Sequence, residues 1–198
     1  MNEKKSQKSY MEKISWYWNL IHFLFFKIDI YAAKVITSPI RWLGNAIINT
    51  EPFKKRLEKN GSSPEEFTKQ LRSQNDNPKT SNSIYIAGGV TGSLIGFTIF
   101  SLFNLLQIII DVNFFKYIVN NEMYWLVTIF ALTIPPLLFN HSILYKNDKY
   151  LQYFKKFNKM SKEQRKRDYW ISFIIVFSMV IFILGSFILY IQVKPGFN

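Results

Sequence analysis

The sequence predicts an all-α integral membrane protein with three transmembrane helices, and three observations lead to this class. The chain has three long apolar stretches, at about 84–110, 123–145 and 170–193. Each is long enough to span, because a transmembrane helix needs about 20 mostly apolar residues. Tyrosine and tryptophan stand at the ends of the second and third stretches, as is typical of the membrane–water interface. Lysine and arginine concentrate outside them, with 14 in residues 1–83 and nine in 146–168.

The first stretch is the longest run without a charged side chain, and it carries a regular spacing of small residues. Gly88, Gly92 and Gly96 recur at every fourth position. Small residues at this spacing let two helix backbones approach closely in a bilayer. The predicted helix-packing face consists of Gly88, Gly89, Gly92, Ser93, Gly96, Asn104 and Gln107. Its partner is either another protein or another helix of the same chain.

The overall composition excludes several kinds of site. The chain has no cysteine, so a disulfide framework, a thiolate nucleophile and a cysteine-ligated metal are all absent. The net charge is +12. The positions of the basic residues favour membrane orientation over nucleic-acid binding as the reason for this charge.

Residues 14–37 have the pattern of an amphipathic helix that lies on the membrane surface. Its apolar face consists of Tyr17, Leu20, Ile21, Leu24, Ile28, Tyr31 and Val35. Asn19, His22 and Asp29 lie opposite. A charge near the centre of a span costs about 2.5–3.5 kcal/mol, and each large aliphatic residue returns only about 0.3–0.6 kcal/mol. Lys27 and Asp29 therefore disfavour a true span, which stays open as an alternative together with a helix packed on protein.

Pro39 predicts a break after this helix, and residues 40–48 form a second short apolar segment at the membrane surface. Residues 51–83 are the one stretch expected to be soluble. Ser63 and Glu66 form a capping-box pattern with Pro64 at the first helical position, which predicts a helix over about 64–72. Residues 73–83 are a polar linker.

The second span is interrupted by Pro135 and Pro136, which remove two backbone donors. Residues 146–168 then form a basic amphipathic segment with an aromatic stripe, and Ser161–Gln164 resembles another helix start. We expect basic side chains to attract anionic lipid headgroups. These residues are Lys27, Lys34, Lys149, Lys155, Lys156, Lys159, Arg165, Lys166 and Arg167.

The basic segments also predict the orientation and the domains. The positive-inside rule places residues 1–83 and 146–168 in the cytoplasm, with the C-terminus outside. The expected organisation has a polar, basic tail (residues 1–13) and amphipathic membrane-surface helices in 1–50, and a cytoplasmic helix and linker in 51–83. Residues 84–198 form a three-helix transmembrane domain with the basic cytoplasmic amphipathic loop 146–168. The expected location is the bacterial inner membrane. If residues 14–37 spanned, the chain would cross four times and its N-terminus would lie outside.

No catalytic, cofactor or metal site is predicted. His22 and His141 are the only histidines and are not spaced as a ligand pair. No nucleophile elbow, P-loop or dinucleotide fingerprint occurs, and no acidic pair lies at membrane depth. Nucleic-acid binding has no fold signature behind it.

The sequence thus favours a non-enzymatic assembly or scaffold subunit that packs through the glycine face and lies against anionic lipid. Its partner is another membrane protein or a second copy. The alternative is a small oligomeric channel, transporter or lytic pore lined by Asn104, Gln107 and the Pro135–Pro136 break. A membrane-embedded enzyme is the third and least supported hypothesis.

Overall fold

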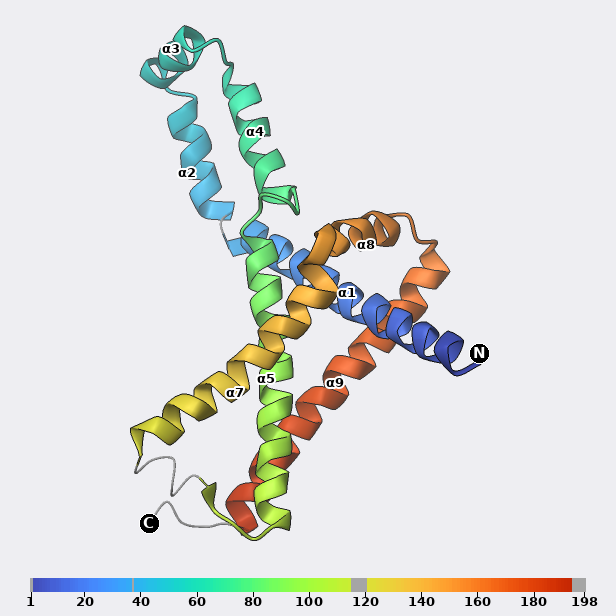
Figure 1. Cartoon of the computed structure of the whole chain (residues 1–198). Coiled ribbons are helices and arrows are strands. Elements are labelled where there is room, and N and C mark those ends of the chain that lie inside the picture. Colours follow the sequence, from blue (N-terminus) through green and yellow to red (C-terminus); the bar gives the residue numbers. More distant parts are fainter. Residues whose placement is uncertain (1, 37, 115–120, 194–198) are drawn as a thin grey trace. The chain divides into compact units, whose positions relative to one another are not determined.

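The computed structural model describes residues 2–36, 38–114 and 121–193, and the regular structure in these residues is entirely helical. Three helices are long and apolar enough to cross a membrane, which confirms that part of the prediction. They are α5 (Ser83–Ile109), the helix that begins with α7 (Glu122–Asn140), and α9 (Lys162–Val193), all shown in Figure 1.

The chain folds as two compact units. One comprises Met1–His22 together with Gly88–Asn198, and the other comprises Phe23–Ala87. The long helices α1 (Asn2–Ile36) and α5 each contribute residues to both units. Residues 2–13, expected as a polar tail, are part of α1.

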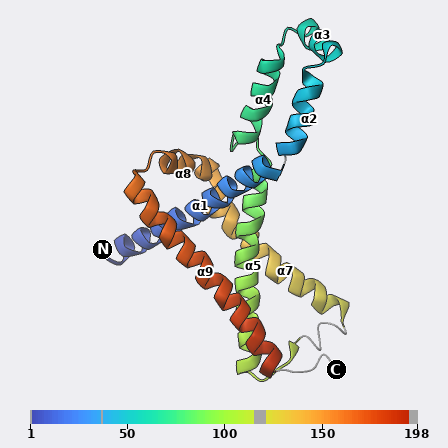
Figure 2. The same cartoon turned by 180° about the vertical axis from the view of Figure 1, so that it is seen from behind.

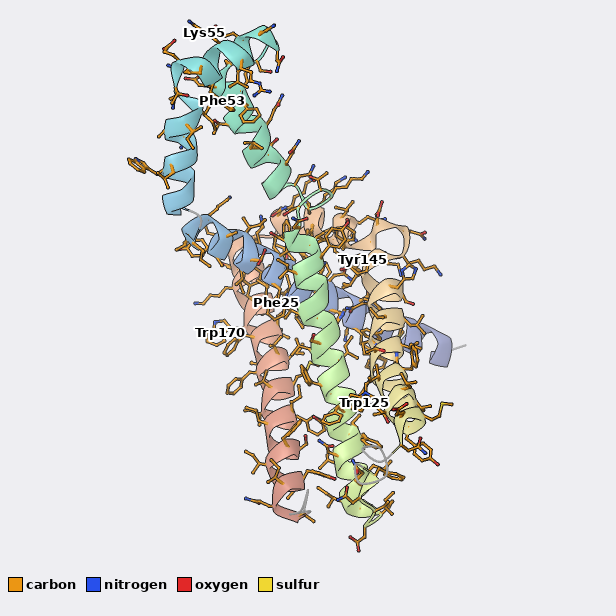
Figure 3. The ribbon with its side chains drawn as sticks, turned by 90° about the vertical axis from the view of Figure 1, so that its left-hand side faces the viewer. Phe25, Phe53, Lys55, Trp125, Tyr145 and Trp170 are labelled. Atoms are coloured by element: carbon orange, nitrogen blue, oxygen red, sulfur yellow. The ribbon has the colours of Figure 1, made fainter. Side chains whose placement is uncertain are left out.

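The smaller unit carries three short helices, α2 (Ser38–Ile48), α3 (Glu51–Lys59) and α4 (Pro64–Asp76). The turn between α3 and α4 contains Gly61, whose φ of +71° suits glycine. Ser63 Oγ then accepts from Glu66 N at 3.1 Å, and Glu66 Oε2 accepts from Ser63 N at 3.1 Å. This reciprocal pair caps α4. Phe53 of α3 packs against Phe67 of α4 with ring centroids 6.1 Å apart, and Figure 3 labels Phe53 in this hairpin.

In the larger unit the helix of the second span changes geometry after its prolines. α7 runs through Pro135 and Pro136 and is followed by a π-helix over His141–Tyr145. Asn147 and Asp148 then have left-handed backbone angles, with φ of 59° and 52°. Asparagine and aspartate adopt this conformation more readily than most residues. The turn leads into α8 (Lys149–Asn158) and then α9, where Gln164 N donates to Ser161 Oγ at 3.2 Å.

The structure does not confirm the amphipathic surface helix expected for residues 14–37. Asn19 and His22, placed on the outward polar side, are buried together with Leu20 and Ile21 of the apolar face, whereas Ile28 and Tyr31 further along that face are exposed. The burial of Asn19 is possible because its Nδ2 donates to Ser15 O at 2.7 Å and to Ile143 O at 3.2 Å. The first half of α1 therefore packs on protein, which was the alternative to a surface helix.

The three candidate spans bury little of their surface inside the chain. Only 17%, 17% and 11% of their most apolar windows are buried. Between Glu122 and Pro135 only Thr128 and Leu132 are even partly covered. Figures 1 and 2 agree that the N-terminal end of α7 lies away from α5 and α9. Lipid or another protein must cover these apolar side chains in a membrane.

Candidate functional site: the glycine face and its contacts

Three glycines of the predicted packing face approach the second span of the same chain. A Cβ built on Gly88 would collide with the Tyr145 hydroxyl. At Gly92 it would lie 3.2 Å from Asn140 Nδ2, and at Gly96 it would lie 3.6 Å from the Leu132 carbonyl. The approach is therefore tightest at Gly88 and loosens along α5.

The remaining small residues of the predicted face are not in this contact. A Cβ built on Gly89 meets no atom within 4 Å, and the side chain of Ser93 is exposed. The small residues therefore belong to two neighbouring surfaces of α5. The second span of the same chain covers the surface with Gly88, Gly92 and Gly96, and the surface with Gly89 and Ser93 is exposed.

Gly96 packs against a turn of α7 that contains a proline. Pro136 has no N–H, so the Leu132 carbonyl four residues earlier loses its helical donor. This carbonyl and Pro136 Cγ are the nearest atoms to a Cβ built on Gly96, at 3.6 and 3.7 Å. A methyl group at Gly96 would therefore be in ordinary van der Waals contact with the proline-containing turn of α7.

Asn140 is the hydrogen-bonding centre of the contact, and it joins three helices. Its Nδ2 donates to Gly88 O at 3.1 Å and lies 3.4 Å from Thr91 Oγ1. Its Oδ1 accepts from Trp18 Nε1 of α1 at 3.0 Å. One buried amide therefore uses both its donor and its acceptor to hold α1 and α5 to the end of α7 (Figure 1). We call Trp18, Gly88, Thr91, Gly92 and Asn140 the Asn140 cluster.

Aromatic side chains extend this contact from α1 to α8. The His22 ring lies 5.9 Å from Tyr145, 6.1 Å from Tyr150 and 5.7 Å from Phe154, measured between centroids. Trp16 lies 5.0 Å from Phe157 in an edge-to-face arrangement. The aromatic stripe predicted for residues 146–168 therefore lies against α1, with Tyr150, Phe154 and Phe157 buried.

A buried carboxylate connects α1 to the start of α9. Trp16 Nε1 donates to Asp168 Oδ2 at 3.3 Å, and Arg167 Nε donates to Asp168 Oδ1 at 2.9 Å. Asp168 is only 2% exposed, and these charge-assisted bonds offset the cost of burying it. The first half of α1 therefore contacts each of the helices α7, α8 and α9.

The two amides predicted to close the glycine face lie at the other end of α5, where the partner is α9. Gln107 Oε1 accepts from Phe114 N at 2.9 Å and from the Tyr190 hydroxyl at 3.4 Å. The same hydroxyl lies 3.2 Å from Asn113 Oδ1. Asn104 is also buried, and its Oδ1 accepts no hydrogen bond from the described residues. Gln107 is thus on the glycine side of α5, but it bonds Tyr190 of α9 and Phe114 and not the second span.

The basic residues predicted to contact lipid are mostly exposed and have different local partners. Lys27 lies over the Phe23 ring at 5.4 Å, and Lys156 lies over Tyr153 at 5.1 Å. Lys149 Nζ donates to Ser142 O at 3.2 Å. The side chains of Lys34, Lys155, Lys159, Lys166 and Arg167 are exposed, and Arg165 is partly covered. Lys27 and Lys34 lie on α1 in the smaller unit, and the others lie on and after α8 and at the start of α9 in the larger unit.

Several residues of the site were not predicted as site residues. Trp18, Tyr145 and Asp168 have no spacing that distinguishes them in the sequence. Asn140 had a usable signal, since a polar side chain just after two prolines in an apolar span needs a partner. The neighbouring His141 is exposed.

No protein-family model, no curated protein and no solved structure matches this chain.

Proposed function

We propose that this protein is a non-enzymatic scaffold subunit of a membrane assembly. The observation that carries the proposal is the large uncovered surface of the three apolar helices, of which 11–17% is buried within the chain. Lipid supplies no hydrophobic drive for association, so a partner would bind through close packing. The open small residues Gly89 and Ser93 are where a second backbone could approach α5 most closely.

The proposed arrangement gives the glycine face two roles. Gly88, Gly92 and Gly96 pack the second span of the same chain, and the Asn140 cluster stiffens that contact. The side of α5 with Gly89 and Ser93 receives a transmembrane helix of another protein. The smaller unit adds a further contact surface, because Trp42 and Ile47 of α2 are 71% and 58% exposed.

We also propose an orientation. The basic segments would face the cytoplasm of a bacterial cell, placing the N-terminus inside and the C-terminus outside. In this arrangement the Asn140 cluster and α8 lie at the cytoplasmic ends of the spans.

The alternative of an oligomeric channel or pore has less geometric support. Its expected lining residues Asn104 and Gln107 are 1% and 0% exposed, and Pro136 is buried. In one chain Asn104, Gln107 and Pro136 face protein, whereas Pro135 is exposed, so a pore lined by all four would need a different packing.

The test uses the full chain, extracted from its native membrane in mild detergent. A photo-crosslinking residue at Ser93 should attach one unlike membrane protein in fixed ratio, and the same residue at the exposed Leu102 should not. Gly89→Ile should reduce recovery of that partner, whereas Gly96→Ala should not. A particle containing only the 23.5 kDa chain would reject the scaffold, and a ring of identical chains would favour the pore.

A further inference from the structure

The first turns of α9 carry a shallow cavity that none of the contacts above uses. It has a volume of about 380 Å³ and is lined by Lys166, Tyr169, Trp170 and Phe173. Tyr169 and Trp170 follow Lys166 by three and four positions, and Phe173 follows them by four and three, so the four residues share one side of the helix. Figure 3 shows Trp170 pointing away from α5. We propose that this cavity binds one anionic phospholipid, with its headgroup at Lys166 and an acyl chain along the aromatic rings below.

Lys166 differs from its two basic neighbours in its partners. Arg165 Nη2 donates to Met160 O at 3.5 Å, and Arg167 pairs with the buried Asp168 at 2.9 Å. Within the part of the chain that the structure describes, no carboxylate pairs with Lys166. Lys166 is exposed and lines this shallow cavity together with three aromatic residues, and a phosphate is the group complementary to its charge.

The apolar part of the site is a wall of rings arranged along the span. Trp170 and Phe173 meet edge to face with centroids 5.8 Å apart, and Phe173 stacks on Phe177 at 5.8 Å and 12°. All three rings are more than half exposed. The order of cation, phenol, indole and phenyl rings matches the polarity of a phospholipid from headgroup to chain.

The length of this wall fits a single leaflet. Lys166 and Phe177 are 11 positions apart, which is about 16 Å along a helix that rises ~1.5 Å per residue. One leaflet provides roughly 15 Å of hydrocarbon, half of the ~30 Å core. A lipid that starts at Lys166 would therefore cover the wall to its end. A second membrane protein is the competing occupant, and the experiment below separates the two.

The test measures lipids retained by the full-length protein in native mass spectrometry. The protein is equilibrated with phosphatidylglycerol and phosphatidylcholine of identical chains. We expect one phosphatidylglycerol to be retained in preference to phosphatidylcholine. Lys166→Gln should weaken phosphatidylglycerol retention about five-fold, since a basic residue near the surface contributes roughly that factor. Phe173→Ala should lower retention of both lipids.

The matched controls are Lys79→Gln, an exposed cation outside the residues expected to contact lipid, and Ile188→Ala, an exposed residue near the other end of α9. Both should retain lipid like the parent, and inorganic phosphate should not displace it. The proposal fails if the parent retains both lipids equally, or if Lys79→Gln weakens retention as much as Lys166→Gln. It also fails if a tightly bound protein covers Trp170 and excludes lipid. An unchanged unfolding temperature checks that the variants fold.

Discussion

Gly88 occupies the tightest point of the contact between α5 and the second span. The nearest atom to a Cβ built there is the hydroxyl oxygen of Tyr145, followed by its Cζ at 3.2 Å. This ring is held in turn by His22 and Tyr150, with centroids 5.9 and 5.7 Å away. A side chain at Gly88 would have to displace a ring that other rings hold in place.

Alanine substitutions at the glycines of α5 should therefore change the unfolding temperature by amounts that differ in sign and size. Gly88→Ala should lower the unfolding temperature in mild detergent, because overpacking costs about 1–3 kcal/mol and exceeds the ~1 kcal/mol gained in helix propensity. Gly92→Ala should have a smaller effect, since Asn140 Nδ2 would be 3.2 Å away. Gly96→Ala should leave stability unchanged or slightly higher.

Two variants make this series decisive. Gly89→Ala is the control, because a Cβ there meets nothing within 4 Å. Tyr145→Phe should partly rescue Gly88→Ala by removing the colliding oxygen. Equal losses at Gly88 and Gly89 would show that the face has been assigned to the wrong side of α5.

Among the helices, the first half of α1 contacts the C-terminal end of α7, the helix α8 and the start of α9. Trp16 contacts Tyr153 and Phe157 of α8 and donates to Asp168 of α9. Trp18 reaches Asn140 at the end of α7. Aromatic pairs contribute about 0.5–1.5 kcal/mol each, so no one contact decides whether α1 stays docked.

Removing one of these side chains should loosen α1 and α8 together. Trp16→Ala deletes two ring pairs and one hydrogen bond, and should speed amide hydrogen exchange about ten-fold in residues 14–22 and 150–157. The measurement is exchange mass spectrometry of the full chain in mild detergent. Tyr31→Ala, at a 72% exposed position of the same helix, should change neither segment. Faster exchange in α1 alone would mean that the two helices are not coupled.

Across the larger unit, a cluster of basic residues and the contacts of α1 occur at the same end of the transmembrane helices. α8 and the start of α9 carry much of the basic charge, and they are also the elements that hold α1. An orientation with these residues in the cytoplasm would place the contacts of α1 on the cytoplasmic side. Topology mapping tests this orientation.

Single cysteines can be introduced directly, because the chain has none. Lys79→Cys and Lys159→Cys should be shielded from an impermeant thiol reagent in intact cells and should label once the membrane is opened. Glu122→Cys, at the start of α7, should label in both. All three positions are exposed on the protein, so burial does not confuse the result. Labelling of Lys159→Cys in intact cells would reverse the proposed orientation.

The three apolar helices, and roughly where each begins and ends, are predictable from the amino-acid sequence alone. α5 and α9 have bounds of Ser83–Ile109 and Lys162–Val193, close to the predicted span at 84–110 and the helix start near Lys162. These features depend on apolar length and on local caps, such as Ser63 with Glu66. Both are readable from residues that are near each other in the chain.

Which faces of the helices are covered, and by which groups, depends on contacts between residues far apart in the chain. Polarity places Asn19 and His22 toward water, yet Asn19 bonds the carbonyl of Ile143, 124 positions away. The glycine spacing likewise predicted a close approach without saying that Tyr145, Asn140 and Leu132 would make it. A residue's preferred side depends on the groups that meet it, and those groups are brought there by the crossing of distant helices. Local patterns carry no information about that crossing.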